Sequence, residues 1–340
     1  MVCRTVYLAQ EGDEGMRTQV GPMKQKTVLP QAITAASLLA RGEPPPIDWV
    51  LPGLPARQVG LLVGSDGCRK TVFALQAALG VAGGLPIAGG ALDAPSSRGR
   101  VVAVLGEDDL DDYHRAVANL RISLVDRGGS AARIDDALEQ IDIVALGAVR
   151  VPLLRAGRQA DEPLETEWVG AMRERLDGAR LAILDPLVMF HSLSESDNGH
   201  LDVFMRLLIR LAQGCGGGSI LAVHHTSQDG LLNARDDHQA GRGGTALASA
   251  ARAVWVIRRP TSQECERAGI DHRTSRVVRG SKISKGPEQP ARILTMDARG
   301  TLFVDQAAEN RLASTVRPSR SKGEKAVEIG KDGVGGDDEW

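Results

Sequence analysis

The sequence has few aromatic residues, few cysteines and no excess of charge of either sign. Aromatic residues make up 3% of its 340 residues, so the core has to be built from aliphatic side chains and alanine. The four cysteines, Cys3, Cys68, Cys215 and Cys265, are scattered without CxxC spacing, which favours neither a zinc site nor a disulfide framework. Lys and Arg number 41 and Asp and Glu 43, giving a net charge of -2, so any contact with nucleic acid has to be local.

Long apolar runs are also lacking. No run approaches the about 18 residues that a transmembrane helix requires, and the N-terminus lacks the charged-then-apolar layout of a signal peptide. Hydrophobic residues at 42% and charged residues at 25% are the balance of a globular protein. We therefore expect a cytoplasmic protein without a membrane partner.

The composition divides the chain into an ordered centre and two polar ends. We expect a flexible N-terminal arm over residues 1–28, one domain over 29–313 and a disordered tail over 314–340. A short helix is expected from about Leu29 to Arg41.

Five short apolar runs alternate with segments of helical length. The runs are Val59–Val63, Val101–Leu105, Ile141–Ala145, Leu181–Leu184 and Ile220–Val223. The expected helices are Val72–Val81, about Asp112–Asp126, about Thr166–Leu176 and Leu201–Ala212. Apolar strands without polar alternation, joined by helix-length crossovers, predict an α/β fold with a mostly parallel sheet covered by helices on both faces.

The chain becomes rich in strands after Ser249. The expected strands are Arg252–Arg258, Arg276–Ser284, Arg292–Asp297 and Thr301–Val304. Ala298, Arg299 and Gly300 supply the turn of the last hairpin. This succession of strands with a short turn predicts an antiparallel β extension near the C-terminus.

The first strand leads into a candidate phosphate loop. Residues 64–71 read Gly-Ser-Asp-Gly-Cys-Arg-Lys-Thr and precede a helical stretch. In such a loop the backbone N–H groups and the helix N-terminus face phosphates, the Lys reaches the β/γ oxygens and the Thr hydroxyl binds Mg²⁺. The predicted ligands of ATP and Mg²⁺ are Gly64, Gly67, Cys68, Arg69, Lys70, Thr71 and Val72.

One residue departs from the pattern of the phosphate loop. The pattern has Gly immediately before the Lys, whereas this chain has Arg69. The positive charge of Arg69 favours phosphate, but its side chain has to find space against the nucleotide or the neighbouring strand. Two interpretations are therefore possible: the loop binds nucleotide normally, or Arg69 obstructs it.

Two further strands end in acids at the expected ligand-binding edge of the sheet. Glu107 follows one strand and is the candidate that orients and deprotonates an attacking water; the alternative is that Glu107–Asp109 cap the next helix. Asp185 ends another strand and is a candidate Mg²⁺ ligand beside Thr71, unless it is an ordinary strand end before Pro186.

A histidine pair, His224 and His225, ends the strand that begins at Ile220. Paired histidines more often satisfy local hydrogen bonds than bind metal, and no third ligand stands at a suitable spacing. At a strand end of this fold, one of them is a candidate to sense the γ-phosphate.

Taken in order along residues 30–305, these features resemble the hexameric replicative DNA helicases of the plasmid RepA type, within the RecA-like P-loop ATPases. The matching segments are Pro44–Gly53, the phosphate loop, Gly106–Asp108 with His114 and Arg115, Leu184–Asp185 with Phe190 and His191, Gly216–Ile220 with His224 and His225, Arg242–Gly243 and Arg252.

The resemblance implies a RecA-like core, a homo-oligomeric ring of six subunits and ATP with Mg²⁺ bound between neighbouring subunits. It places Lys70 at the phosphates, Glu107 at the catalytic base and His225 at the phosphate sensor. It also implies that Asp185 is the Walker B acid and that Arg252 is an arginine finger reaching the next subunit's nucleotide. The alternative for Arg252 is a surface charge at a strand edge.

The segment from Ser227 to Gly244 is a weak candidate for contact with single-stranded DNA. By the resemblance it faces the central channel, and it carries Arg235 and Arg242. It also holds three aspartates and lacks an aromatic residue for stacking.

Two functions from different classes fit the sequence. The first is a ring-forming Mg-ATP-dependent motor, a replicative DNA helicase of a plasmid, phage or mobile element that also meets replication proteins. The second is a degenerate RecA-like ring or adaptor that binds DNA or protein partners without efficient ATP hydrolysis, which Arg69 favours. A RecA-like ATPase with a regulatory task and no unwinding would use the same site as the first.

Overall fold

The computed structural model describes residues 31–147, 149–157, 163–225 and 244–314, and its chain divides into two units, Met1–Pro46 and Ile47–Trp340. In the first unit α1 spans Ala35–Leu39, shorter than the helix expected up to Arg41. The side chain of Thr34 begins it by accepting a hydrogen bond from the amide of Ser37. The expected arm lies outside the described residues, and of the expected tail only Ser314 is described, so those boundaries remain predictions.

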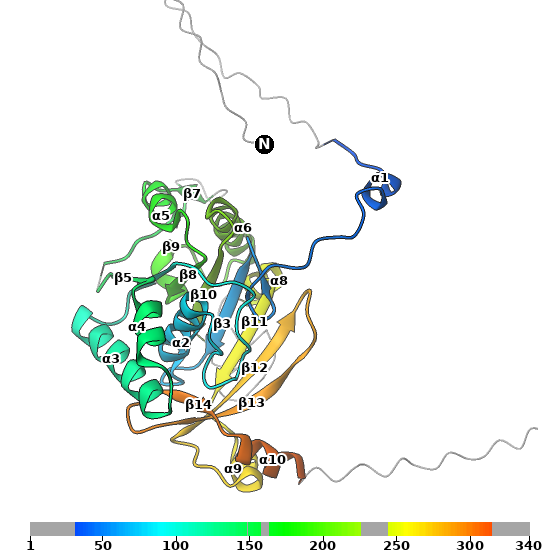
Figure 1. Ribbon diagram of the computed structural model, residues 1–340. Helices are drawn as coiled ribbons and strands as arrows, with labels where there is room; N and C mark the ends of the chain where they lie inside the picture. The colour runs from blue at the N-terminus through cyan, green and yellow to red at the C-terminus, as the bar shows by residue number, and fades with distance from the viewer. Residues whose placement is uncertain (1–30, 148, 158–162, 226–243, 315–340) are drawn as a thin grey trace, which may run out of the picture. The chain divides into compact units, whose positions relative to one another are not determined.

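In the second unit nine of the described strands form one sheet in the order β14-β13-β12-β11-β3-β10-β8-β4-β5 (Figure 1). The parallel strands are β3 (Val59–Gly64), β4 (Val101–Leu105), β5 (Ile141–Ala145), β8 (Leu181–Asp185), β10 (Ser219–His225) and β11 (Ala253–Arg258). The antiparallel extension is β12 (Ser275–Ile283), β13 (Gln289–Met296) and β14 (Leu302–Val304). Both parts of the predicted sheet are confirmed.

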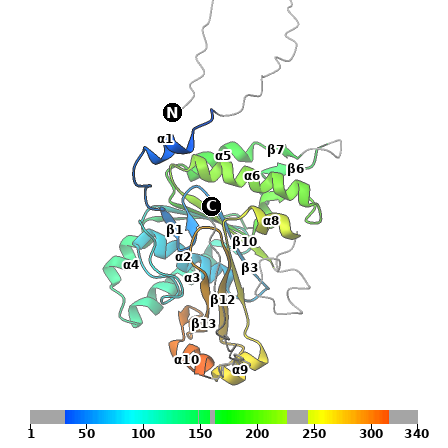
Figure 2. The same ribbon diagram turned by 90° about the vertical axis from the view of Figure 1, so that its right-hand side faces the viewer.

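Helices cover both faces of the sheet (Figure 2). One face packs against α2 (Lys70–Gly83), α3 (Leu110–Asp126) and α4 (Ala131–Leu138), and the other against α5 (Trp168–Leu176), α6 (Asn198–Gly214) and α8 (Gly244–Ala250). The side chains of β8 alternate accordingly, with Leu181 and Ile183 in the first layer and Ala182 and Leu184 in the second. All four are buried, which explains why the strand reads as a continuous apolar run.

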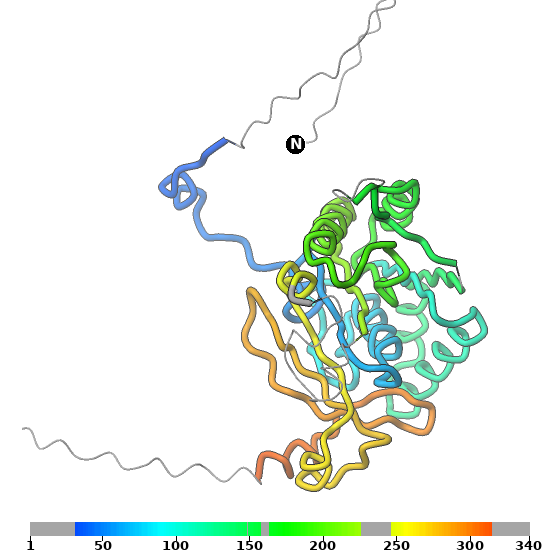
Figure 3. Tube along the Cα trace, turned by 180° about the vertical axis from the view of Figure 1, so that it is seen from behind, coloured from blue at the N-terminus to red at the C-terminus, as the bar shows by residue number. Residues whose placement is uncertain are grey.

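The sequence analysis did not predict several elements. They are α4, the 3₁₀ turn η1 (Leu187–Phe190), the short strands β1 (Trp49–Leu51), β2 (Leu54–Pro55), β6 (Leu154–Arg155), β7 (Leu164–Glu165) and β9 (His191–Ser192), and the helices α9 (Ser262–Ala268) and α10 (Gln306–Ser314). Figure 3 shows α9 and α10 side by side beyond the antiparallel strands. A small cluster of Ala268, Ile293 and Ala308 joins them to β13.

The strand register brings the expected site residues to one edge of the sheet. Leu105 pairs with Asp185, and His225 pairs with Gly64. The carboxyl ends of β3, β4, β8 and β10 therefore meet where ligands bind in open α/β sheets.

Candidate functional site

The phosphate loop connects the end of β3 to the first turn of α2. Inside it, the amide of Cys68 donates to the carbonyl of Ser65 at 3.3 Å, and Nζ of Lys70 donates to the same carbonyl at 3.0 Å. A Cβ on Gly64 would lie 2.4 Å from the carbonyl oxygen of Ile257, so the close approach of β3 to β11 requires glycine there. The loop is thus closed around its lysine, whose side chain is buried.

Arg69 adopts the backbone conformation that glycine usually supplies. Its φ is +68°, in the left-handed region, and it precedes α2 without a capping hydrogen bond from its side chain. Such a conformation costs a non-glycine residue on the order of 1 kcal/mol or more. The exposed side chain extends to the turn between β13 and β14, where its Nη2 lies 3.0 Å from the position of a Cβ on Gly300. The loop therefore keeps a glycine-like path while the arginine side chain lies against the hairpin turn.

A hydrogen bond joins the loop to the centre of the sheet. The hydroxyl of Thr71 donates to Oδ2 of Asp185 at 2.7 Å, and Asp185 is buried at the end of β8. Burial raises the pKa of Asp185 to about 6, with a further contribution from the charge of Glu107, while the bond from Thr71 opposes the shift. The two predicted Mg²⁺ ligands are therefore in direct contact.

His225 contacts two other predicted residues, Glu107 and Lys70, and also Asp66, which the sequence analysis did not single out. Its Nε2 donates to Oε1 of Glu107 at 3.1 Å, its Nδ1 donates to Oδ1 of Asp66 at 2.6 Å, and Nζ of Lys70 lies 3.4 Å from Nδ1. The hydrogen bond to Glu107 raises the pKa of His225, and the same bond holds the pKa of Glu107 below its ordinary value. The arrangement favours an imidazolium between two carboxylates.

The acids after β4, Glu107 to Asp109, had two possible roles from the sequence, capping of the next helix and catalysis, and the structure assigns them to different residues. Asp109 caps α3, since its side chain accepts a hydrogen bond from the amide of Asp112. The amide of Asp108 donates to the hydroxyl of Tyr113 at 3.0 Å. Glu107 instead turns its carboxylate to His225. Capping is therefore the task of Asp109, and Glu107 faces the site.

A cavity of about 870 Å³ opens beside the loop. Asp66, Glu107, Asp108 and Asp112 line it, together with Gly67, Arg69, Lys70, Thr71 and Val72. Its wall also includes four arginines that sequence reasoning missed, Arg259, Arg273, Arg276 and Arg299. No local motif marks them, because they come from a distant part of the chain: Arg259 follows the parallel strand β11, and the other three belong to the antiparallel extension, where Arg276 is 209 residues from Gly67.

Arg252 lies apart from these residues. Its amide donates to the carbonyl of Val59 at 2.8 Å, at the start of β3, whereas the phosphate loop follows the end of that strand. Strand geometry separates the two ends by about 17 Å. Arg252 therefore does not join the site of its own chain. The DNA-binding candidates Arg235 and Arg242 lie outside the described residues.

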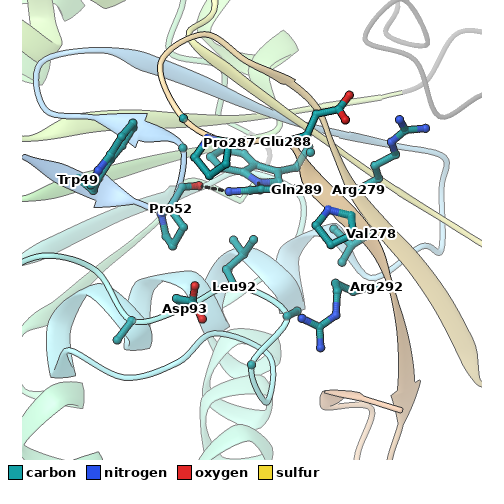
Figure 4. Close-up of a pocket in the computed structure, with 18 of the residues that line it drawn as sticks. Trp49, Pro52, Leu92, Asp93, Val278, Arg279, Pro287, Glu288, Gln289 and Arg292 are labelled. Atoms are coloured by element: carbon teal, nitrogen blue, oxygen red, sulfur yellow. Dashed lines mark hydrogen bonds between the residues drawn. The ribbon is translucent and has the colours of Figure 1, made fainter. Parts of the chain in front are cut away.

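A second cavity, of about 390 Å³, contains none of the predicted site residues (Figure 4). Gln289 crosses it, donating from Nε2 to the carbonyl of Pro52 at 2.7 Å and accepting from Nε1 of Trp255 at 2.8 Å. These bonds attach the turn between β1 and β2 to the sheet. The cavity offers no arrangement of catalytic groups comparable to that beside the phosphate loop.

The donor set suits Mg²⁺, which prefers oxygen ligands and retains several waters. Thr71 and Asp185 offer a hydroxyl and a carboxylate. Within the described residues no group of three or more His, Cys, Asp or Glu side chains could hold a metal ion. Mg²⁺ bound by these two residues would complete its coordination with water and substrate phosphates.

The chain has a phosphate loop between a parallel strand and a helix, and an acid and a histidine at the ends of neighbouring strands. This arrangement is that of the P-loop NTPase class. The α/β fold predicted from the sequence is the fold of that class. The family model described as "AAA domain" matches residues 24–230, and the chain belongs to that family. The chain is also similar to a solved structure whose title describes an "ATPase Domain", with 14% identity, a TM-score of 0.49, and coverage of 73% of this chain and 84% of that chain. No helix within the described ranges is both long and apolar enough to cross a membrane.

Asp185→Asn tests the electrostatic cost of the buried carboxylate. Because the folded-state pKa of about 6 lies above the ordinary 3.8, the wild type loses stability as pH rises between these values. At pH 8 we expect the variant to be more stable by up to about 3 kcal/mol. The advantage should shrink as the pH falls toward 4.5, as measured by urea unfolding of both proteins. An advantage that does not change with pH would contradict this account.

Proposed function

We propose that this protein is a Mg-ATP-dependent motor ATPase that forms a ring and acts on DNA, as a replicative helicase does. The observation that carries the proposal is the meeting of Lys70, Thr71, Asp185, Glu107 and His225 at one edge of the sheet. The match to the AAA domain family supports the use of a nucleotide.

Each of these residues has a role in hydrolysis. Lys70 holds the β- and γ-phosphates together with the loop amides. Thr71 and Asp185 would hold Mg²⁺, which would neutralise charge on the phosphates. Glu107 orients the attacking water and accepts its proton. The basicity of Glu107 depends on His225, because their hydrogen bond lowers the pKa of the carboxyl group.

His225 supplies the phosphate sensor. A γ-phosphate beside Lys70 would compete with Glu107 and Asp66 for the imidazolium, since all three are anionic partners within one small site. A shift of His225 toward the phosphate releases Glu107 to act on water. The side chain of His225 thereby reports the presence of the γ-phosphate to β10.

The position of Arg252 supports an assembly in which neighbouring copies share a site. An exposed arginine at the opposite edge of the sheet cannot serve the site of its own chain, but it can reach the nucleotide of a neighbouring copy. The resemblance to the plasmid RepA-type helicases supports this finger role and a ring of six subunits. Contact with single-stranded DNA rests on Arg235 and Arg242, and contact with replication proteins rests on the resemblance alone.

A degenerate ring or adaptor is the second candidate, and Arg69 is the observation that favours it. The left-handed backbone and the position of the side chain beside Gly300 support the active enzyme instead. The motor is expected to hydrolyse ATP, whereas the adaptor is expected to hydrolyse it inefficiently or not at all.

Steady-state hydrolysis of ATP with Mg²⁺, measured with and without single-stranded DNA, tests the motor directly. We expect turnover that DNA stimulates, and its loss in Lys70→Ala because the phosphates lose their cationic partner. A folded wild type without turnover would favour the adaptor. Turnover that DNA leaves unchanged would favour a regulatory ATPase without unwinding.

Arg69→Gly tests whether the phosphate loop accommodates the arginine side chain or whether that side chain obstructs nucleotide binding. The side chain lies against the hairpin turn, so we expect kcat/KM for Mg-ATP to change by less than about threefold. We also expect a higher melting temperature, since the left-handed strain is removed. A rise in kcat/KM of about tenfold or more would mean that Arg69 obstructs the site.

Mixing Arg252→Ala subunits with wild-type subunits tests the finger in trans. Each variant subunit would disable a neighbour's site, and arginine fingers contribute about 10³–10⁵ in rate. If hydrolysis also depends on coordination around the ring, turnover should fall more steeply than the fraction of variant protein. A strictly proportional fall would mean that the sites hydrolyse ATP independently. A mixture of Arg252→Ala and Lys70→Ala subunits tests the finger itself, because it joins intact loops to intact fingers of neighbouring copies; a mixture that regains no turnover would contradict the finger in trans.

A further inference from the structure

The outer side of the phosphate loop rests on a buried arginine. Arg276, the second residue of β12, has 2% of its surface exposed. Its Nη2 donates to the carbonyl of Gly67 at 2.9 Å, and its Nη1 donates to the carbonyls of Ser275 and Arg273 at 2.6 and 3.1 Å. The contact joins segments that are 209 residues apart in the sequence.

Among the described residues, Arg276 has no carboxylate as a hydrogen-bond or ion-pair partner. All the acceptors that the described part of the protein offers it are neutral backbone carbonyls, and its Nε has no partner there. Burial lowers the pKa of Arg276, as do the charges of Arg259 and Arg69, yet guanidinium stays protonated in proteins. Burying an uncompensated charge is costly, so packing alone does not account for an arginine here.

The contact to Gly67 also fixes the direction of one peptide group. In a trans peptide the C=O and the N–H point in opposite directions. Arg276 draws the Gly67 carbonyl outward, and the amide of Cys68, in the same peptide group, points inward and donates to Ser65. Gly67 has a φ of +70°, which lets the chain make this turn.

Two further guanidinium groups lie around the same turn. Nη2 of Arg259 is 3.4 Å from the position of a Cβ on Gly67, and Arg69 belongs to the loop itself. These guanidinium groups line the cavity beside the loop, and the acids Glu107 and Asp185 lie near its lysine. A polyanion in the loop would provide the missing counter-charge.

We propose that Arg276 is a positioning residue for the phosphate chain of the nucleotide, holding the Gly67–Cys68 peptide in its binding orientation and supplying a fixed positive charge behind the loop. The inference rests on the proposed function, because it assigns a role toward the same ligand. The ligand group concerned is the polyphosphate and not the base.

Binding of Mg-ATP and of inorganic tripolyphosphate, measured by calorimetry, tests the inference in the full chain. We expect Arg276→Met to weaken both ligands by about tenfold or more, because a charge-assisted contribution is lost. Arg276→Lys, which keeps the charge, should stay within about threefold of wild type. In turnover, Arg276→Met should raise KM with kcat nearly unchanged, as expected for contacts made equally in ground and transition states.

Thermal unfolding without ligand separates this role from a structural one. Arg276→Met should leave the melting temperature unchanged or raise it, since a buried unpaired charge is removed. The matched control is Arg292→Met on β13, which breaks the ion pair with Glu309 of α10 and should lower the melting temperature without weakening ligand binding.

The outcomes distinguish the inference from the function. A wild type that binds neither ligand overturns the proposed function and the inference with it. A wild type that binds both, with Arg276→Met binding equally well, overturns the inference alone. If Arg276→Lys and Arg276→Met are equally weak, the charge is irrelevant and the inference is also overturned.

Discussion

The hydrogen bond from Thr71 to Asp185 is the contact on which the rest of the site depends. It ties the first turn of α2 to the centre of the sheet, so the phosphate loop cannot move without disturbing a buried carboxylate. Asp185 in turn pairs through the backbone with Leu105, which sets the position of Glu107 two residues later. The loop, the acid and the base are therefore held by one continuous piece of rigid structure.

Much of the fold could be predicted from the sequence, because most of the parallel strands are buried on both faces and carry no polar alternation; the edge strand β5, with the exposed Asp142, is the exception. Val101–Leu105 and Ile141–Ala145 have the same bounds in the structure as in the prediction. The helices that were missed are short or lie on the rim, where few buried positions create a pattern. α9 begins with a capping box between Thr261 and Glu264, a local signal that could have revealed it.

Part of the site could be predicted from the sequence because its residues follow the apolar strands that the sequence reveals. Glu107, Asp185 and His225 stand at strand ends, and a parallel sheet brings such ends together. The hydrogen bonds among them depend on side-chain directions that a linear pattern does not contain. Arg276 reaches the loop from the antiparallel extension, and its buried contact with Gly67 depends on the packing of β12 beside β11.

The position of Arg252 constrains the symmetry of any assembly that uses it. The phosphate loop and Arg252 lie at opposite ends of the parallel strands. A two-fold dimer is isologous and uses the same patch on both copies, so it could pair each finger with a loop only if one patch contained both ends of the strands. A heterologous, head-to-tail interface joins the unlike edges without that condition, and its rotation per subunit decides whether the chain of copies closes into a ring or grows as a helical filament.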